Sequence, residues 1–316
     1  MKRFKNILYL ADSNGNRDTV FQHAAGLARK NRARLKAVVV LEAPPERARS
    51  RLRKKHSLDM QKVLTQSYTA KLEKLVAPLK RSGLRTKTRV LFGNPFIEVI
   101  REVLRDKHDL VVKGAQGRRR VKEMIFGSTT MHLMRKCPAP VWVIKPTRHK
   151  SFARVLAAVD PAAEDGKARR QWDAMNAKIL ELASSLSEMA GNDLHVIGAW
   201  TIYGESHLTG QGIPHEELRR YRLETKSAYS KALEELVKKH VPPSTAVQVH
   251  LLKGDPGRVI PQFVKNHQVD VIVMGTLSRT GVSGLFIGNT AEKILGGVGC
   301  SVLTVKPEGF VSPVRL

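Results

Sequence analysis

A glycine-rich segment in the first half of the chain has the residue types and the spacing of a phosphate-binding loop. It reads GAQGRRRVKEMIFGST, in which Gly114 and Gly117 are followed by Gly127 and Ser128. Glycine lets backbone N–H groups approach a phosphate without a Cβ in the way. Gly127 precedes a predicted helix, whose unpaired N–H groups favour an anion and which Ser128 is placed to cap. The segment indicates a site for a phosphorylated ligand, although two glycine turns flanking a helix entry would have the same sequence.

Two acidic residues are the other candidates for chemistry, because each ends an apolar run of strand length. ILYLAD ends in Asp12 and VLAAVD ends in Asp160. A carboxylate there can accept hydrogen bonds from a ribose or a base, or hold Mg²⁺ through phosphates. The sequence has no Walker loop, no kinase signature and no motif that pairs a nucleophile with a base. We therefore expect a binding protein, with slow Mg²⁺-dependent ATP hydrolysis as an alternative.

The histidines and cysteines form no recognisable metal-binding motif. Eleven histidines occur without a His-x3-His pair, and Cys137 and Cys300 are far apart in the sequence. Cys137 precedes Pro138 just before a predicted strand, which favours a small buried residue. Two cysteines also exclude a disulfide-stapled secreted scaffold. No apolar run approaches the roughly 20 residues that span a bilayer, so we expect a soluble cytoplasmic protein.

Positive charge is concentrated in the first half of the chain. Residues 1–150 hold 36 basic and 11 acidic residues, whereas residues 151–316 hold 19 and 17. The densest basic stretch is RARSRLRKKH, from Arg47 to Lys55 with His56 after it. It could neutralise phosphates of a nucleic acid or an anionic surface, but the aromatic residues that stack on single strands are missing. Non-specific electrostatic binding is thus an alternative function, and a solvated basic surface would explain the charge equally well.

The chain contains an internal repeat, as its length of 316 residues suggests. DLVVKG recurs as DVIVMG and LFGNP as LKGDP, each 161 residues later, whereas Asp12 and Asp160 are 148 apart. The second copy therefore carries a net insertion of 13 residues between its first and third strands. We predict two domains, residues 1–148 and 149–316, with a junction near residues 147–151.

Each copy alternates short apolar runs with segments of helical periodicity. In the first copy the expected strands are Ile7–Leu10, Leu35–Leu41, Thr86–Phe92, Leu110–Lys113 and Val141–Ile144. The expected helices between them are 17–30, 47–79, 95–105 and 128–136. The second copy repeats this order, with strands at Val155–Val159, Leu194–Ala199, Val247–Leu252, Val271–Met274 and Val302–Val305 and helices at 173–189, 216–239, 257–266 and 290–295. The pattern predicts an α/β fold with two doubly wound five-stranded parallel sheets, and ligands at the carboxyl ends of their strands.

With these motifs, nearly the whole chain resembles the universal stress protein family, in its tandem two-domain (UspE-like) type. The strand followed by Gly-x2-Gly-x9-Gly-Ser is similar to that family's ATP-binding signature, and GTLSRTGVSGLFIGNTAEKIL in the second copy is similar to the corresponding stretch. The resemblance implies an adenine nucleotide alpha-hydrolase-like fold and a stress-response role with ATP, AMP or ADP, and Mg²⁺, as ligands. It also implies that the last strands of the two copies pair within the chain, and it allows homodimerisation.

The resemblance assigns binding positions in both copies. In the first copy they are Asp12 and Val40 for the nucleoside and Gly114, Gly117, Gly127, Ser128 and Thr129 for the phosphates. In the second they are Asp160 and Ala199, then Gly275, Ser278, Gly288, Asn289 and Thr290. Ser278 adds a side chain where the first copy has a glycine, while Asn289 is placed to cap the following helix. We therefore expect the first copy to be the better ATP site, with Lys113 and Arg118–Arg120 adding positive charge.

Overall fold

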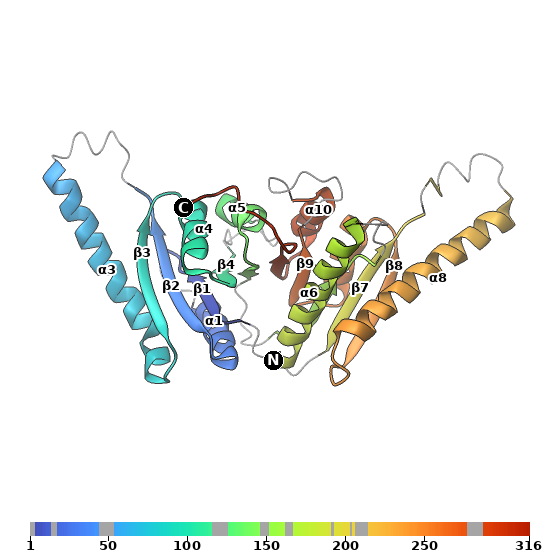
Figure 1. The fold of residues 1–316 in the computed structure, drawn as a ribbon, viewed down its shortest axis with the longest axis horizontal. Coiled ribbons are helices and arrows are strands. Elements are labelled where there is room, and N and C mark those ends of the chain that lie inside the picture. Colours follow the sequence, from blue (N-terminus) through green and yellow to red (C-terminus); the bar gives the residue numbers. More distant parts are fainter. Residues whose placement is uncertain are drawn as a thin grey trace. The chain divides into compact units, whose positions relative to one another are not determined.

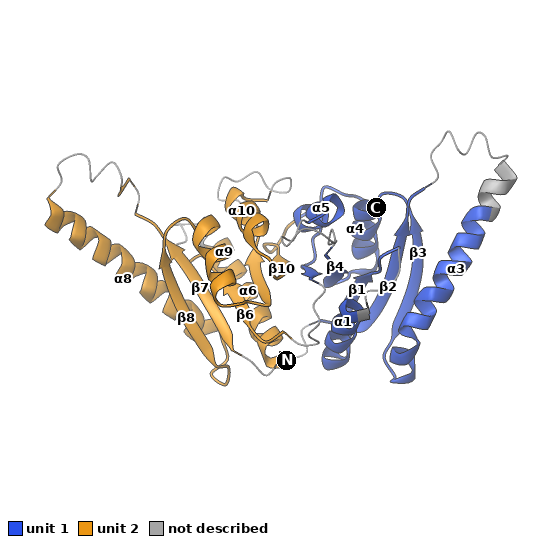
Figure 2. Cartoon of the chain, turned by 180° about the vertical axis from the view of Figure 1, so that it is seen from behind, with its two compact units in different colours: residues 1–119, 125–150, 311–316 blue, residues 120–124, 151–310 orange. Residues whose placement is uncertain are grey.

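Strands and helices alternate along the chain, and the computed structural model shows them in the residues that it describes. These are residues 4–13, 18–43, 54–115, 126–145, 152–161, 167–190, 193–202, 204–205, 214–276 and 287–316. The chain divides into two units (Figure 2), namely unit 1 with residues 1–119, 125–150 and 311–316, and unit 2 with residues 120–124 and 151–310. The predicted domain boundary at 148/149 lies outside the described residues.

Unit 1 contains a parallel sheet whose strand order is β3-β2-β1-β4-β5 (Figure 1). Its elements are β1 (Asn6–Leu10), α1 (Asp18–Asn31), β2 (Arg34–Leu41), α3 (Lys54–Arg81), β3 (Thr86–Phe92), α4 (Pro95–Asp106), β4 (Leu110–Gly114), α5 (Ser128–Lys136) and β5 (Val141–Ile144). Helices α1 and α3 pack on one face of the sheet, and α4 and α5 pack together on the other. The strand order reverses between β1 and β4, which makes that point the expected ligand crevice of a doubly wound sheet.

Unit 2 repeats this arrangement with the strand order β10-β9-β6-β7-β8, again with parallel pairs. Its elements are β6 (Val155–Ala158), α6 (Lys167–Ala190), β7 (Leu194–Trp200), α8 (His215–His240), β8 (Val247–Lys253), α9 (Pro256–Asn266), β9 (Val271–Gly275), α10 (Asn289–Gly297) and β10 (Ser301–Val305). Its reversal point lies between β6 and β9. The α/β fold with parallel sheets is therefore confirmed.

Burial explains why the apolar runs predict the strands so well. Every residue of β1 is buried, and in β2 all residues after Arg34 are buried. Such strands are covered on both faces, so their sequences are largely apolar and do not alternate, apart from the buried polar residues Asn6 and Lys36. The first five residues of β3, at the sheet edge, instead alternate half-buried and exposed positions. Of the predicted helix that begins at Arg47, residues 47–53 lie outside the described part, and α3 is observed from Lys54.

The repeat extends to single backbone angles. Gly93 and Gly254, which are 161 residues apart, have φ angles of 138° and 134°, where only glycine is unstrained. Each donates its N–H to the last residue of a neighbouring strand, Gly93 to Leu41 at 3.0 Å and Gly254 to Trp200 at 2.9 Å. The LFGNP and LKGDP motifs are thus strand-to-helix turns, and α4 and α9 each begin at the proline of their motif.

The aspartates that open DLVVKG and DVIVMG hold the first strand of each unit in place. The carboxylate of Asp109 accepts the backbone N–H groups of Lys5 at 2.6 Å and Asn6 at 3.1 Å. In unit 2, Asp270 accepts those of Ala153 at 2.8 Å and Arg154 at 2.9 Å. These repeated acidic residues therefore have a structural role.

We predict that Asp109→Asn lowers the free energy of unfolding of unit 1 by about 1.5–3 kcal/mol, because an amide replaces a charged acceptor of two N–H donors. Urea denaturation measures the change. Asp193→Asn, at an exposed position with no such pair of bonds to the described residues, is the control and should change the stability by less than about 0.5 kcal/mol. Equal stabilities of the two variants would contradict this role.

Candidate functional site

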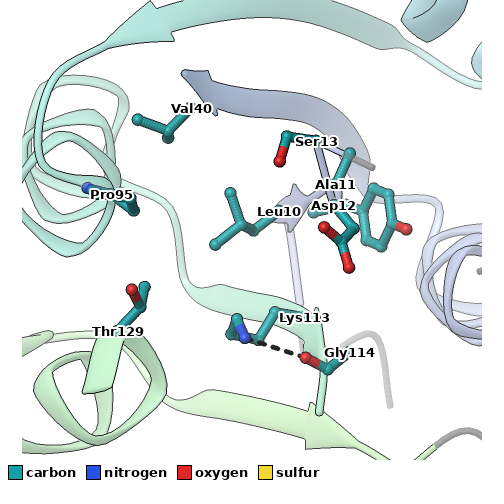
Figure 3. Close-up of a pocket in the computed structure, with 10 residues that line it drawn as sticks. Leu10, Ala11, Asp12, Ser13, Val40, Pro95, Lys113, Gly114 and Thr129 are labelled. Atoms are coloured by element: carbon teal, nitrogen blue, oxygen red, sulfur yellow. Dashed lines mark hydrogen bonds between the residues drawn. The ribbon is translucent and has the colours of Figure 1, made fainter. Parts of the chain in front are cut away.

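Unit 1 has a pocket at the reversal point between β1 and β4, at the carboxyl ends of the strands (Figure 3). Its walls come from the end of β1 and the residues after it, from β2 and β4, and from the first residues of α4 and α5. They enclose about 100 Å³, whereas small-molecule sites usually measure roughly 300–1,000 Å³. Residues 14–17 and 116–125, which follow two lining segments in the sequence, lie outside the described residues. The described walls thus accommodate only part of a nucleotide-sized ligand.

Three kinds of polar group face this pocket. Asp12 follows β1, and its carboxylate points toward the side formed by Lys113 and Gly114 (Figure 3). The Nζ of Lys113 donates to the backbone oxygen of Gly114 at 3.0 Å and to Oγ1 of Thr130 at 2.9 Å. Thr129 adds a hydroxyl from α5. An acceptor for hydroxyl or amino groups and a buried ammonium thus lie in one crevice, a combination that suits a phosphorylated polar ligand.

The N-terminus of α5 adds backbone donors beside the pocket. The prediction that Ser128 caps this helix is wrong, because Gly127 is the N-cap and Ser128 is the first, exposed residue of the helix. Gly127 has no side chain that could accept a hydrogen bond, and α5 has no acidic residue in its first turn. The first N–H groups of α5 therefore have no side-chain cap, which is the condition under which a helix N-terminus binds an anion.

The structure brings together four of the seven residues predicted for the first copy, because Asp12, Val40, Gly114 and Thr129 all line the pocket. Gly127 and Ser128 lie at the start of α5 but are not among the lining residues, and Gly117 lies outside the described part. The other lining residues are Tyr9, Leu10, Ala11, Ser13, Pro95 and Lys113. Of these, the sequence indicated only Lys113, as a nearby charge. Pro95 belongs to the repeated LFGNP motif, which could have identified it.

In unit 2, side chains from α6 cover the edge of the sheet that corresponds to the edge with the pocket in unit 1. The helix α6 has 24 residues and α1 has 14, so most of the insertion in the second copy extends this helix. Met175 packs against Gly275 so closely that an added Cβ would lie 2.9 Å from its Sδ. The amide of Asn176 donates to the backbone oxygen of Asp160 at 2.7 Å and accepts its N–H at 3.1 Å. Helix α6 therefore fills the space next to the reversal point.

One further difference makes this edge of unit 2 less suited to phosphates. A glycine, Gly288, is the N-cap of α10 just as Gly127 is the N-cap of α5, so the prediction that Asn289 caps this helix is wrong. The first turn of α10 carries the acidic residue Glu292, which disfavours an anion at that helix end. Asn289 and Thr290 are exposed, and Ser278 lies outside the described residues.

A pocket of unit 2 lies instead at the ends of β7 and β8. It includes Glu205, whose Oε1 accepts hydrogen bonds from Lys253 Nζ at 2.6 Å and Arg222 Nε at 2.9 Å. These bonds hold the pKa of Glu205 below its ordinary value. The positions predicted in the second copy, Asp160, Ala199 and Gly275, do not line this pocket.

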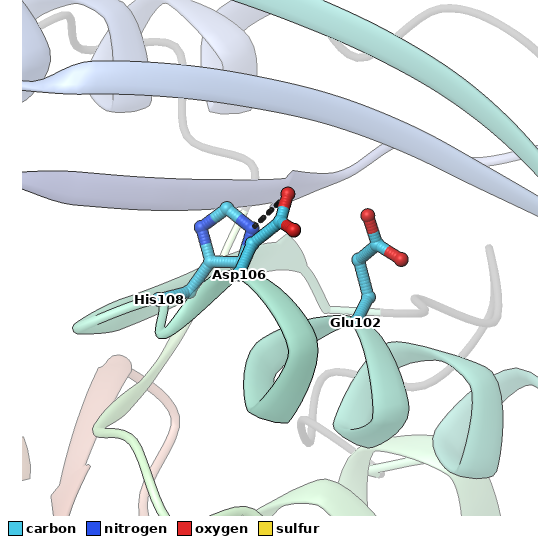
Figure 4. Close-up of side chains that lie close together, drawn as sticks. All are labelled: Glu102, Asp106 and His108. Carbon is cyan, nitrogen blue, oxygen red and sulfur yellow. Dashed lines mark ion pairs between the residues drawn. The ribbon is translucent and has the colours of Figure 1, made fainter. Parts of the chain in front are cut away.

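A buried charged cluster in unit 1 lies between α4 and the sheet. It includes Glu102, Asp106 and His108, whose potential metal-ligand atoms lie within 4.8 Å of one another (Figure 4). The Nζ of Lys36, however, forms ion pairs with both carboxylates, at 2.8 Å for Asp106. Arg89 and Arg105 also pair with Glu102, at 3.0 and 2.6 Å.

These basic groups already neutralise the two carboxylates of the cluster. The hydrogen bond from Lys36 lowers the pKa of Asp106, and burial lowers the pKa of His108. A metal ion would have to displace the Lys36 ammonium from between the carboxylates. The cluster is therefore a salt-bridge network that fixes α4 on β2 and β3.

Both units match the same protein family. The family model described as the universal stress protein family matches residues 3–145 and again residues 152–306. The chain belongs to this family. Universal stress protein E of Escherichia coli is 28% identical over 328 residues, with 100% of this chain and 98% of that protein covered. The homologue from Haemophilus influenzae is 23% identical, with 96% and 98% covered. The tandem arrangement of two universal stress protein domains is therefore confirmed.

Solved structures share the fold of this chain. The crystal structure of a functionally unknown protein from Pseudomonas aeruginosa has a TM-score of 0.72 at 23% identity, and covers 98% of this chain and 95% of its own. A universal stress protein from Archaeoglobus fulgidus has a TM-score of 0.64 at 17% identity, covering 95% and 98%. Within the described residues, no helix is both long and apolar enough to cross a membrane.

Proposed function

We propose that the chain binds one adenine nucleotide, ATP or the related AMP or ADP, in the pocket of unit 1, and acts as a nucleotide-responsive module of the stress response. One observation carries this proposal. The predicted nucleotide positions Asp12, Val40, Gly114 and Thr129 lie in one pocket at the reversal point of the sheet. Ligands of doubly wound sheets bind at this point.

The chemistry of the pocket indicates which side would hold the base and which side would hold the phosphates. Val40 and Leu10 provide an apolar wall for a base, and Asp12 can accept a hydrogen bond from a ribose hydroxyl. The Lys113 ammonium and the uncapped N-terminus of α5 provide positive potential for the phosphates. Mg²⁺ would enter with the phosphates, with Asp12 as the carboxylate that could hold it. Binding and not turnover is therefore the proposed activity.

We predict that Lys113→Met weakens ATP binding about tenfold, which corresponds to about 1.4 kcal/mol, while adenosine binding stays unchanged. Methionine is the residue that unit 2 has at this position, as Met274. The ammonium of Lys113, which is held by Gly114 and Thr130, supplies positive charge to the phosphate side of the pocket, so we expect its loss to affect the phosphates and not the nucleoside. Isothermal titration calorimetry measures both ligands, with Lys87→Met on the exposed face of β3 as the matched control. An equal loss for ATP and adenosine would refute the phosphate role of Lys113.

A second candidate function, non-specific binding to nucleic acid or an anionic surface, is supported by the excess of 36 basic over 11 acidic residues in positions 1–150. Such binding falls steeply with salt. We would titrate a short oligonucleotide at two salt concentrations, with wild-type protein and a variant blocked in the pocket. A salt-sensitive affinity that the pocket variant leaves intact would assign this activity to the basic surface.

Slow ATP hydrolysis remains a separate alternative at the same pocket. It would appear as Mg²⁺-dependent phosphate release that Asp12→Asn removes while ATP binding persists. Phosphate release at the background rate by wild-type protein would exclude it and leave the binding proposal unaffected.

A further inference from the structure

Unit 2 holds a cluster of three histidines on the face of its sheet that α9 covers. His195 lies in β7, His250 in β8 and His267 directly after α9. His195 Nδ1 lies 3.0 Å from His250 Nε2. The ring centroid of His267 is 6.1 Å from that of His195 and 5.9 Å from that of His250. Phe263 stacks on His267 with a centroid distance of 3.8 Å.

The same places in unit 1 hold the salt-bridge network. Lys36 pairs in register with Lys87 and His195 with Gln248, and Val38 pairs with Arg89 as Ile197 pairs with His250. These matches put His195 at the place of Lys36 and His250 at the place of Arg89.

The helix that covers this face of the sheet, α4 in unit 1 and α9 in unit 2, shows the same replacement of charged residues. The offset of 161 puts Phe263 at the place of Glu102 and His267 at the place of Asp106. Unit 2 has thus replaced the charged groups of a self-neutralised network by imidazoles and a phenyl ring. Imidazoles without a neighbouring carboxylate partner in the cluster have nitrogen lone pairs available for another cation.

We propose that His195 and His250, with His267 as a third ligand, form a site for a divalent transition metal of the class that prefers imidazole, namely Zn²⁺, Cu²⁺ or Ni²⁺. Metal–nitrogen bonds are about 2.0–2.1 Å long. Two such ligands lie about 2.9 Å apart at a right angle and about 3.4 Å apart at the tetrahedral angle. The observed 3.0 Å between His195 Nδ1 and His250 Nε2 falls within this range.

The third histidine has a suitable tautomer. His267 Nδ1 lies 3.1 Å from the backbone oxygen of Phe263, which can only accept, so Nδ1 carries a proton and donates. In the neutral ring Nε2 then has the lone pair, and a backbone carbonyl bonded to the other nitrogen is the usual support of a metal-binding histidine. His267 is exposed, and to act as the third ligand its ring must shift toward the other two rings while its Nδ1 keeps the bond to Phe263.

The protonation states of His195 and His250 also suit metal binding. Burial lowers the pKa of both His195 and His250, which favours the neutral form that binds metal. Asp193 raises the pKa of His195, whereas Arg154 and His267 lower it. Without metal, the two rings share one proton across the 3.0 Å contact. Metal binding moves that proton to the other nitrogen of the same ring, and no net proton is released.

The test uses the full chain, titrated with Zn²⁺ by calorimetry and with Cu²⁺ by electron paramagnetic resonance. We expect one Zn²⁺ per chain and coupling of Cu²⁺ to at least two imidazole nitrogens. His250→Gln should weaken Zn²⁺ binding by at least about 100-fold, and His267→Gln by about tenfold. His132→Gln is the matched control, because His132 also stacks on a phenylalanine, Phe96, at 4.3 Å, and should bind as wild type does.

Two outcomes would overturn the site. One is the absence of stoichiometric Zn²⁺ and Cu²⁺ binding, which would leave His195 and His250 as a hydrogen-bonded packing pair. The other is Zn²⁺ binding of equal strength in His250→Gln and wild type. The exposed His267→Gln variant keeps the test valid if His250→Gln is unstable, because its thermal unfolding should match that of wild type. Wild-type affinity in a folded His267→Gln would contradict the third ligand.

Discussion

Val40→Phe is expected to reduce the ATP affinity of the chain by at least about 100-fold, which corresponds to about 2.7 kcal/mol. Val40 is 8% exposed and lines the pocket of about 100 Å³ in unit 1. A phenyl ring at this place fills much of the space left for a base, and close-packed surroundings yield little. Calorimetric titration with ATP measures the loss.

The repeat provides a matched control for this change. Ala199 occupies in β7 the place that Val40 occupies in β2, as the strand registers show. Ala199→Phe should leave the ATP affinity unchanged, because side chains of α6 already cover that edge of unit 2. Unchanged ATP binding in Val40→Phe, or loss of ATP binding in Ala199→Phe alone, would show that the nucleotide is not held where we propose.

Glu102→Leu is expected to lower the free energy of unfolding of unit 1 by about 3–5 kcal/mol. The Glu102 carboxylate is fully buried and pairs with Lys36, Arg89 and Arg105. Its removal leaves the buried Lys36 with Asp106 as the one remaining ion-pair partner among the described residues. Urea denaturation, with hydrogen exchange of β2 and α4 to assign the change to unit 1, measures the loss.

A double variant and a surface variant distinguish the loss of an ion pair from the loss of packing volume as the cause of the destabilisation. Lys36→Met combined with Glu102→Leu should recover part of the loss, because it also removes the buried ammonium that lost one of its two carboxylate partners. Unit 2 already has an uncharged phenylalanine at the place of Glu102. Glu98→Gln on the same helix breaks the more exposed pair with Arg101 and should change stability by less than about 1 kcal/mol. A double variant as unstable as Glu102→Leu would indicate that packing volume dominates.

The sequence predicts the elements of this fold closely because its strands are covered on both faces. The ranges of β3 and α5 agree with the prediction at both ends, since a turn residue stands beside each. The first residue of α6 could not be predicted from the sequence in the same way. Its first two turns precede the predicted start at Asp173, where polar residues hide the helical periodicity. Met175 lies within the predicted helix, but its contact with Gly275 depends on how α6 packs against the sheet, and helical periodicity alone does not give that packing.

The sequence likewise predicts some of the site residues correctly and misses others. Asp12 follows β1, Gly114 ends β4 and Thr129 lies in the first turn of α5, so topology alone brings them to one edge of the sheet. The capping role of Ser128 was wrong because the glycine before it takes the N-cap position. The histidine cluster could not be predicted from the sequence, because His195 and His250 are 55 residues apart and only the pairing of β7 with β8 brings them together.

Native mass spectrometry of the full chain with excess ATP tests the nucleotide proposal most directly, because it counts bound ligands per chain. The pocket in unit 1 and the covered edge in unit 2 together predict a single adenylate on each chain. A spectrum with no ATP retained would contradict the pocket as a nucleotide site, and a spectrum with two would contradict the closure of unit 2 by α6.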